Sequence, residues 1–359
     1  MDDLTIARWR LRTQRLAGPA FGSVPEAVEG LLAVQAENYQ QASWAVSTRT
    51  DGLTRDVFQR LFDNGEILRT HVLRPTWHFV RPADIRWLVD VTAPRILRTM
   101  RQIQTTLDLN YGDLDRSQTV MRESLSRGTC LTRTALRERL EDEGLPTGGQ
   151  RLGLMLASAE LSGLICSGAM EGTDHTYTLL DSRAPDSHVL DRPVALAELA
   201  ARYFTGHGPA TERDLSYWAS LTLTDVRTGI AGAGDRLESI EHDGRTYWFG
   251  EPPPTESHVE PRAQILQVLD EYHNGYQDSR YMLDVAGIVP RTRGANVGMV
   301  LVDGQMIGGM KRVLGADVVR FEINLFRKAD PGEQEAVEQA AARYGTFLGL
   351  EPEVVMAIV

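Results

Sequence analysis

The hydrophobic and polar positions of this chain predict the same order of elements three times. A helix is predicted over residues 4–16. The first round then has apolar positions at helical spacing over residues 25–35, around Trp44, and over residues 55–63. Thr54 is a suitable N-cap for the last of these helices, and Gly65 is a suitable stop. The period then changes, and residues 67–80 predict two strands about a turn near Pro75. Three helices followed by a hairpin are typical of a winged helix-turn-helix.

The second and third rounds follow the same order. Helices are predicted near residues 117–126 and over residues 132–142 and 151–162, followed by strands over residues 164–167 and 175–180. The third round predicts helices over residues 194–204, 212–219 and 223–230, followed by strands over residues 237–241 and 245–249. Asp243-Gly244 between these last strands is a strong two-residue hairpin signal.

The pattern changes again after Glu-Pro-Pro-Pro at residues 251–254, which we interpret as a rigid linker. Residues 297–302, 305–313 and 318–326 predict strands, and residues 332–347 predict a terminal helix. The expected fold is α+β, with three tandem winged helices and a C-terminal antiparallel β domain. The expected boundaries are 1–100, 101–190, 191–254 and 255–359, with residues 101–116 as a polar connector.

Composition limits the classes of protein to consider. The chain has 359 residues, of which 42% are hydrophobic, so it can bury a core without disulfides. It has no apolar run of membrane-spanning length and no signal peptide, so we expect a cytoplasmic protein with no membrane partner. Its two cysteines suit a reducing compartment, and its histidines lack ligand spacing. We therefore expect no metal and no cofactor.

The net charge of −11 argues against general nucleic-acid binding, for which a basic excess is usual. Local basic faces remain, and almost all of their charge comes from arginine, since the chain has only two lysines, Lys311 and Lys328. The residues that we consider as DNA contacts are His71, Arg74, His78, Arg95, Arg98, Arg133, Arg137, Arg151, Lys311 and Arg312. A solvated surface is the competing interpretation for the arginines. Strand alternation would place His71 and His78 on opposite faces.

Gln35 and Glu37 are the residues with the most specific candidate chemistry. On a regular helix they would point in nearly opposite directions, so they converge only if the helix ends there. An amide can offer a water molecule one acceptor and two donors, and a carboxylate can take its proton. The competing interpretation is that they are two solvated polar residues.

Two stretches resemble the winged-helix DNA glycosylases of the AlkZ/YcaQ-like, azinomycin-resistance type. They are Leu-Leu-Ala-Val-Gln-Ala-Glu at 31–37 and Leu-Arg-Thr-His-Val-Leu-Arg-Pro-Thr-Trp-His-Phe-Val at 68–80. Weaker likeness runs through 270–280, 301–304 and 311–312, so it covers nearly the whole chain.

The resemblance implies three winged helices in a C around a duplex, excision of purines alkylated at N7, and unhooking of interstrand crosslinks. The family's catalytic motif is Gln, an apolar residue and Gln, with Asp in the last place in a second branch. Gln35 and Ala36 match this motif, and Glu37 departs from it.

The expected function is therefore a monofunctional DNA glycosylase that uses water, acts as a monomer on alkylated double-stranded DNA, and has Gln35 and Glu37 as catalytic residues. An N7-alkylated purine is cationic and leaves without protonation, so the enzyme needs to stabilise the sugar cation and deprotonate a water. No lysine lies near Gln35 in sequence to form a Schiff base. The alternatives are a non-enzymatic DNA-binding regulator and a protein that sequesters a genotoxin.

Overall fold

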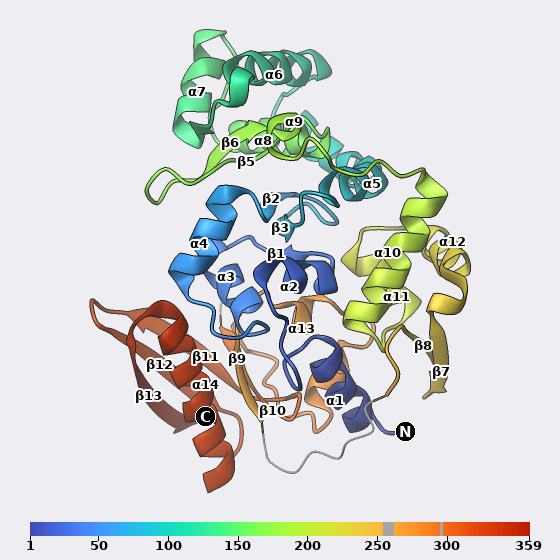
Figure 1. Ribbon diagram of the computed structural model, residues 1–359, viewed down its shortest axis with the longest axis vertical. Coiled ribbons are helices and arrows are strands. Elements are labelled where there is room, and N and C mark those ends of the chain that lie inside the picture. The colour runs from blue at the N-terminus through green and yellow to red at the C-terminus, as the bar shows by residue number, and fades with distance from the viewer. Residues whose placement is uncertain (254–261, 295–296) are drawn as a thin grey trace.

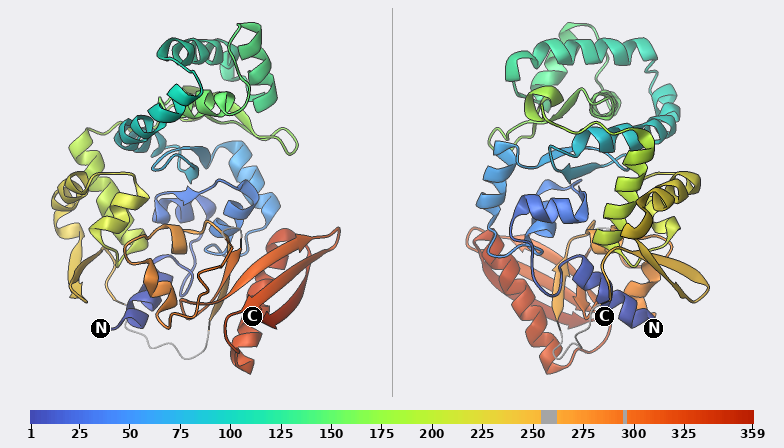
Figure 2. Two further views of the ribbon diagram at one scale, coloured as in Figure 1. Left: turned by 180° about the vertical axis from the view of Figure 1, so that it is seen from behind. Right: turned by 45° about the vertical axis from the view of Figure 1, so that its right-hand side comes forward.

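The computed structural model describes residues 1–253, 262–294 and 297–359 of the chain. It has three winged helices in a C-shaped arrangement and a C-terminal sheet, as the sequence predicts (Figure 1). The second winged helix lies at one end of the molecule, and the C-terminal sheet lies at the opposite end (Figures 1 and 2). Helix α1 (Asp3–Thr13) precedes the first module and lies near the C-terminal region.

The first winged helix follows the predicted order, with one correction. Its elements are α2 (Val24–Leu31), β1 (Val34–Gln35), α3 (Tyr39–Ser47), α4 (Arg55–Asn64), β2 (Leu68–His71) and β3 (Trp77–Val80). Thr54 accepts from the backbone of Val57, and Gly65 ends α4 in the left-handed region, as predicted. The prediction that the preceding helix reaches Gln35 is wrong. The C-cap Leu32 has a φ of 65°, which turns the chain out of α2 and into strand β1.

The second winged helix is joined to the first by a helix longer than predicted. Helix α5 (Ile85–Thr106) crosses the expected domain boundary at 100/101. Most of the predicted polar connector is also helical, because α5 covers its first part and Asn110 begins another helix with a capping box. The module comprises α6 (Tyr111–Ser124), the 3₁₀ turn η1 (Ser126–Gly128), β4 (Leu131–Thr132), α7 (Arg133–Asp142), α8 (Arg151–Leu161), β5 (Ile165–Ser167), β6 (Thr176–Leu179) and α9 (Leu180–Arg183).

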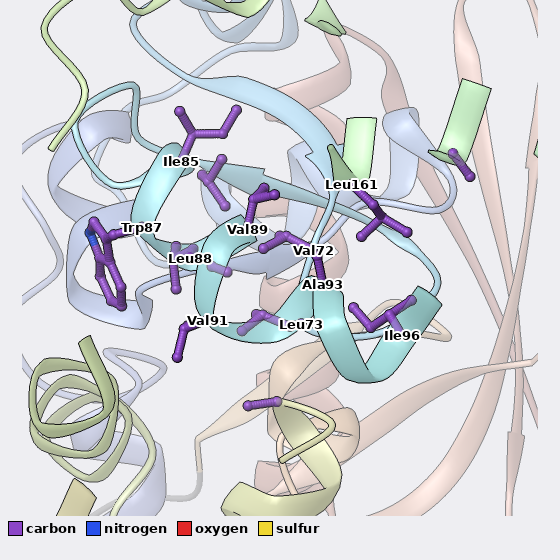
Figure 3. Packing of buried hydrophobic residues seen from close by; sticks show 14 of the residues in the cluster. Val72, Leu73, Ile85, Trp87, Leu88, Val89, Val91, Ala93, Ile96 and Leu161 are labelled. Atoms are coloured by element: carbon purple, nitrogen blue, oxygen red, sulfur yellow. The ribbon is translucent and has the colours of Figure 1, made fainter. Parts of the chain in front are cut away.

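Helix α5 is held by an apolar face. Its buried side chains include Ile85, Leu88 and Ile96, which pack with residues such as Leu73 and Leu161 from neighbouring elements (Figure 3). Helices α8 and α10 both pack against it. The buried side chains of α5 therefore belong to one hydrophobic cluster that includes residues of all three modules.

The third winged helix matches its prediction most closely. It contains α10 (Arg192–His207), α11 (Glu212–Trp218), α12 (Leu223–Ala233), the 3₁₀ turn η2 (Gly234–Arg236), β7 (Glu238–His242) and β8 (Arg245–Phe249). Thr211 and Thr222 form capping boxes with acidic residues three positions later. Asp243 and Gly244 have positive φ values at the hairpin turn.

The three modules share one strand pairing. A short extended segment between the first two helices pairs with the last strand of the hairpin. The pairs are β1 with β3, β4 with β6, and, as a single bridge, Ala210 with Trp248. In the first module this segment contains Gln35, which pairs with His78. The candidate catalytic residue therefore lies on an edge strand of the sheet, beside the central strand β3.

The C-terminal domain corrects the prediction of a purely antiparallel sheet. The sheet order is β13-β12-β11-β10-β9, and β13 (Glu351–Ile358) pairs with β12 (Val318–Leu325) in parallel. Helix α14 (Pro331–Leu348) makes the crossover that a parallel pair requires. The other elements are β9 (Ala263–Leu266), α13 (Glu271–Asn274), η3 (Arg280–Asp284), β10 (Gly298–Val302) and β11 (Gln305–Leu314). Pro254 of the predicted linker and the 254/255 boundary involve residues outside the described ones.

Two contacts dock this domain against the first module. Trp44 stacks on Tyr344 at 4.1 Å between ring centroids, and its indole N–H donates to the carbonyl of Ile265. Arg49 forms a fully buried ion pair with Asp270 at 2.7 Å. These contacts bring α13 to the strand that contains Gln35. Across the described ranges, no helix is long and apolar enough to cross a membrane.

Candidate active site

Gln35 is nearly buried and has hydrogen bonds from both the backbone and the side chain. Its backbone N–H donates to Oε1 of Glu271 at 2.8 Å. Its side-chain oxygen accepts from Nη2 of Arg74 at 3.0 Å and from Nδ2 of Asn274 at 2.8 Å. The first module supplies Gln35 and Arg74, and the C-terminal domain supplies Glu271 and Asn274. The site is therefore composite.

Glu37 lies at the exposed end of the same extended segment. Helix α2 ends at Leu31 and β1 ends at Gln35, so the two residues are not on a helix, and Glu37 follows in a bend. Oε2 of Glu37 accepts from the backbone N–H of Trp77 at 3.3 Å. Arg69 donates to the carbonyls of Ala36 and Glu37 and so holds the backbone of residues 36 and 37 in place. The carboxylate remains accessible to water and substrate.

A tight turn between β2 and β3 aims Arg74 at Gln35. Leu73 has a φ of 65°, which a non-glycine residue adopts only when its surroundings require it. The N–H of Arg74 bonds the carbonyl of Val72, and the N–H of Thr76 bonds the carbonyl of Arg74. This compact turn directs the Arg74 guanidinium inward, where its Nη1 also donates to the carbonyl of Asn274 at 2.9 Å.

Burial and neighbouring polar groups together determine the charges of Glu271 and His78. Burial raises the pKa of Glu271, but hydrogen bonding to His207 and the nearby Arg74 outweigh it and lower that pKa to about 2. The carboxylate is therefore ionised, and it also accepts from the indole N–H of Trp218 at 2.8 Å. Burial, followed by the charge of Arg74, lowers the pKa of His78 to about 3. His78 is neutral at physiological pH.

The structure gives three of the predicted DNA contacts other roles. Arg74 is buried and bonded to Gln35, and it is therefore not a surface phosphate contact. His78 is fully buried, with Nδ1 3.0 Å from the carbonyl of Thr76. His71 is buried on the other side of the hairpin, against Glu160 of the second module. The two histidines lie on opposite faces of the hairpin, as predicted, but both side chains are buried in the protein.

Most of the predicted arginines lie at the surface. Arg95 lines a cleft of about 740 Å³ between α5 and α11, together with Arg213 and Tyr217. Arg98 lines a second cleft, between α5 and α6. Arg133 and Arg137 are exposed on α7. These four residues remain candidates for phosphate contacts.

The remaining predicted contacts divide into one exposed residue and two with internal partners. Lys311 is exposed on β11. Arg151 instead donates to the carbonyl of Leu107 at 2.8 Å and holds α8 to the end of α5. Arg312 is bonded to the hydroxyl of Tyr344.

The cleft beside Arg95 adjoins the site. The guanidinium carbon of Arg74 lies 5.4 Å from the ring centroid of Tyr217, which lines this cleft. Gln277 and Asp278 also line it, shortly after Asn274 in the chain. Arg74 and Tyr217 therefore connect Gln35 to the wall of the cleft. In the part of the chain that the structure describes, no cluster of His, Cys, Asp and Glu is suited to hold a metal.

Sequence reasoning missed Asn274 and Glu271 as site residues. The only signal for them was the resemblance across residues 270–280. No periodicity or spacing relates them to Gln35, which lies 236 residues before Glu271.

Three winged helices with an amide on β1 and an exposed carboxylate two residues later are the features that the sequence comparison can be set against. The sequence model of the family described as "DNA glycosylase AlkZ-like" matches residues 28–347, so the chain belongs to this family of DNA glycosylases. This membership favours the enzyme over the non-enzymatic regulator.

Two known proteins are similar to the chain. An interstrand DNA cross-link repair glycosylase of Streptomyces sahachiroi is 26% identical over 261 residues, which cover 67% of each sequence. The solved structure of the S. sahachiroi DNA glycosylase AlkZ superposes with a TM-score of 0.81 over 100% of both chains, at 21% identity. The structural likeness supports the fold.

Proposed function

We propose that this DNA glycosylase hydrolyses the N-glycosidic bond of N7-alkylated purines in duplex DNA, with Gln35 and Glu37 as its catalytic residues. The observation that carries the proposal is their placement. A fixed amide on the edge strand β1 is followed two residues later by an exposed carboxylate. Arg74 links that amide to Tyr217, which lies in the wall of a cleft lined by arginines.

The proposed reaction suits a carboxylate. The bond between C1′ of the sugar and N9 of the purine breaks, and its electron pair neutralises the cationic base. Glu37 stabilises the developing sugar cation and takes a proton from the water whose oxygen bonds C1′. The two lysines that could form a Schiff base are on β11 and just after β12, and neither belongs to the first module. Hydrolysis is therefore favoured over a lyase reaction.

The proposed substrate is double-stranded DNA, bound by one copy of the chain. Three winged helices in one chain can engage a duplex without a second protomer. Arg95 and Arg213 would bind phosphates beside the site, with Arg98, Arg133 and Arg137 extending the contact towards the second module. The S. sahachiroi relative is named for interstrand cross-link repair. We include duplexes crosslinked through purine N7 among the proposed substrates.

The test is release of base from a defined duplex. Oligonucleotide duplexes containing one N7-methylguanine, or one N7-linked interstrand crosslink, are incubated with the protein and analysed for free base and separated strands. Free N7-methylguanine above the spontaneous rate supports the proposal, and strand separation extends it to crosslinks. Release at the spontaneous rate from both duplexes would overturn it.

A further inference from the structure

We propose that Arg74 and Asn274 lock the side-chain amide of Gln35 so that it acts only as a hydrogen-bond donor, which makes Asn274 a positioning residue of the active site. The inference rests on the proposed function, because it assigns the two catalytic side chains different tasks. It also gives the C-terminal domain a part in catalysis.

The direction of the hydrogen bonds around the Gln35 amide follows from Arg74, whose guanidinium cannot accept a hydrogen bond. A guanidinium has donors only, so the Gln35 atom 3.0 Å from Nη2 of Arg74 must be the oxygen. The second neighbour of that oxygen, 2.8 Å away, must then be the nitrogen of the Asn274 amide. The Asn274 oxygen is left to face Nδ1 of His273 at 2.9 Å, where it accepts. The orientation of both amides is thus set by Arg74.

The segment that contains Asn274 is anchored independently of Gln35. The backbone N–H of Asn274 bonds the carbonyl of Asp270 at 2.8 Å, and its own carbonyl accepts from Arg74. Asp270 is held in turn by Arg49 in a pair that is fully buried on both sides. Rotating the Gln35 amide would therefore place its N–H groups against two fixed donors. A buried clash of this kind costs about 1–3 kcal/mol for each unsatisfied group.

The lock changes the role that the sequence suggests for Gln35. Its oxygen already accepts two hydrogen bonds, which fill its two lone pairs, so it cannot accept a proton or orient a water by accepting from it. Only the N–H groups can face the reactants, and they can donate to an oxygen of the attacking water or of the sugar–phosphate. Glu37 is then the sole acceptor of the motif.

Two kinds of variant test the lock. Gln35→Glu keeps size and shape but replaces the outward N–H₂ with an acceptor, and Asn274→Asp and Asn274→Leu remove the donor that faces the Gln35 oxygen. Gln339→Glu, at an exposed position of α14, is the charge-matched control. Single-turnover excision of N7-methylguanine gives the maximal rate and the protein concentration at half-maximal rate.

The expected result is a change in the chemical step alone. Gln35→Glu should lower the maximal rate at least a hundredfold and the Asn274 variants at least tenfold, with half-saturation within threefold of the wild type. Gln339→Glu should match the wild type. A Gln35→Glu enzyme with wild-type rate, or Asn274 variants altered only in half-saturation, would overturn the lock.

A second measurement does not depend on activity. The Asn274 side-chain amide protons, assigned by NMR from their loss in Asn274→Leu, should exchange slowly with solvent, and those of Gln35 should exchange faster. The reverse order would contradict the lock. If the wild type releases no base while this order holds, the proposed function fails and the lock stands.

Discussion

The backbone N–H of Gln35 donates to the buried carboxylate of Glu271 over 2.8 Å, which joins the first and last domains at the proposed catalytic residues. Glu271 also accepts from Trp218 of the third winged helix. One carboxylate thus ties three domains together at a single point. Loss of its charge should affect both folding and catalysis.

Replacing Glu271 with Gln should lower stability and excision together. An amide at this position has one oxygen for the two donors Gln35 and Trp218, and it removes the negative charge that faces His207 and Arg74. The expected loss in the free energy of unfolding is about 1–3 kcal/mol. Urea unfolding measures it, and Glu335→Gln at an exposed position of α14 is the control. A variant as stable and active as the wild type would contradict the role of Glu271 in both folding and excision.

The protein should lose stability steadily in acid. Unfolded Glu271 takes up its proton near pH 4.5, but the folded group only near pH 2, so its contribution is complete above about 4.5 and is lost as the pH falls. Unfolded His78 protonates near pH 6.5 and the folded group near 3, so stability also falls across this second window. Unfolding free energies measured from pH 7 to 4 should decline.

His78→Phe isolates one part of this pH dependence. Its slope of unfolding free energy against pH should be shallower than that of the wild type between pH 6.5 and 4. Burial also lowers the pKa of His175 and His273 to about 4, so some slope should remain. Parallel curves for variant and wild type would show that His78 is not the buried neutral group described here.

Replacing Glu37 with Gln measures what the carboxylate adds to the family's commoner Gln-apolar-Gln motif. An amide cannot take the water's proton, so excision of N7-methylguanine should fall at least tenfold. Binding of the same duplex should stay within about threefold, a change of roughly 0.7 kcal/mol. Equal excision rates would exclude Glu37 as the proton acceptor.

Binding to undamaged duplex should weaken steeply with salt, since the chain has a net charge of −11 and must attach through local arginines. Arg95→Ala should reduce the slope of log affinity against log salt by about one. Arg236 is already paired with Glu198 at 2.7 Å, so Arg236→Ala should leave the slope unchanged. An affinity equal at low and physiological salt would contradict the arginine cleft as the DNA site.

The three winged helices were predictable because their signals are local. Helical periodicity, the caps Thr54, Thr132 and Thr222, and the hairpin turn at Asp243 each act within a few residues. The parallel strand β13 was not predictable in this way, because the parallel pairing depends on the crossover helix α14.

The site was predictable only in part. Gln35 and Glu37 are marked by their motif, but the partners of Gln35 come from elsewhere in the chain. The interior role of Arg74 depends on the unusual backbone of Leu73 and on the carbonyl of Asn274, which lies 200 residues later. An arginine beside a turn proline has the sequence signature of an exposed residue. Only tertiary packing reveals that it is buried.

The proposed reaction is hydrolysis of a glycosidic bond without a covalent enzyme–DNA intermediate. The most direct measurement uses a duplex with one N7-methylguanine, incubated with the protein and divided into samples with no treatment, alkali or borohydride. The account predicts strand cleavage only after alkali and no protein trapped on DNA. Cleavage without alkali, or a borohydride-trapped complex, would contradict the hydrolytic mechanism, and sequence-specific binding with no abasic product would contradict the function itself.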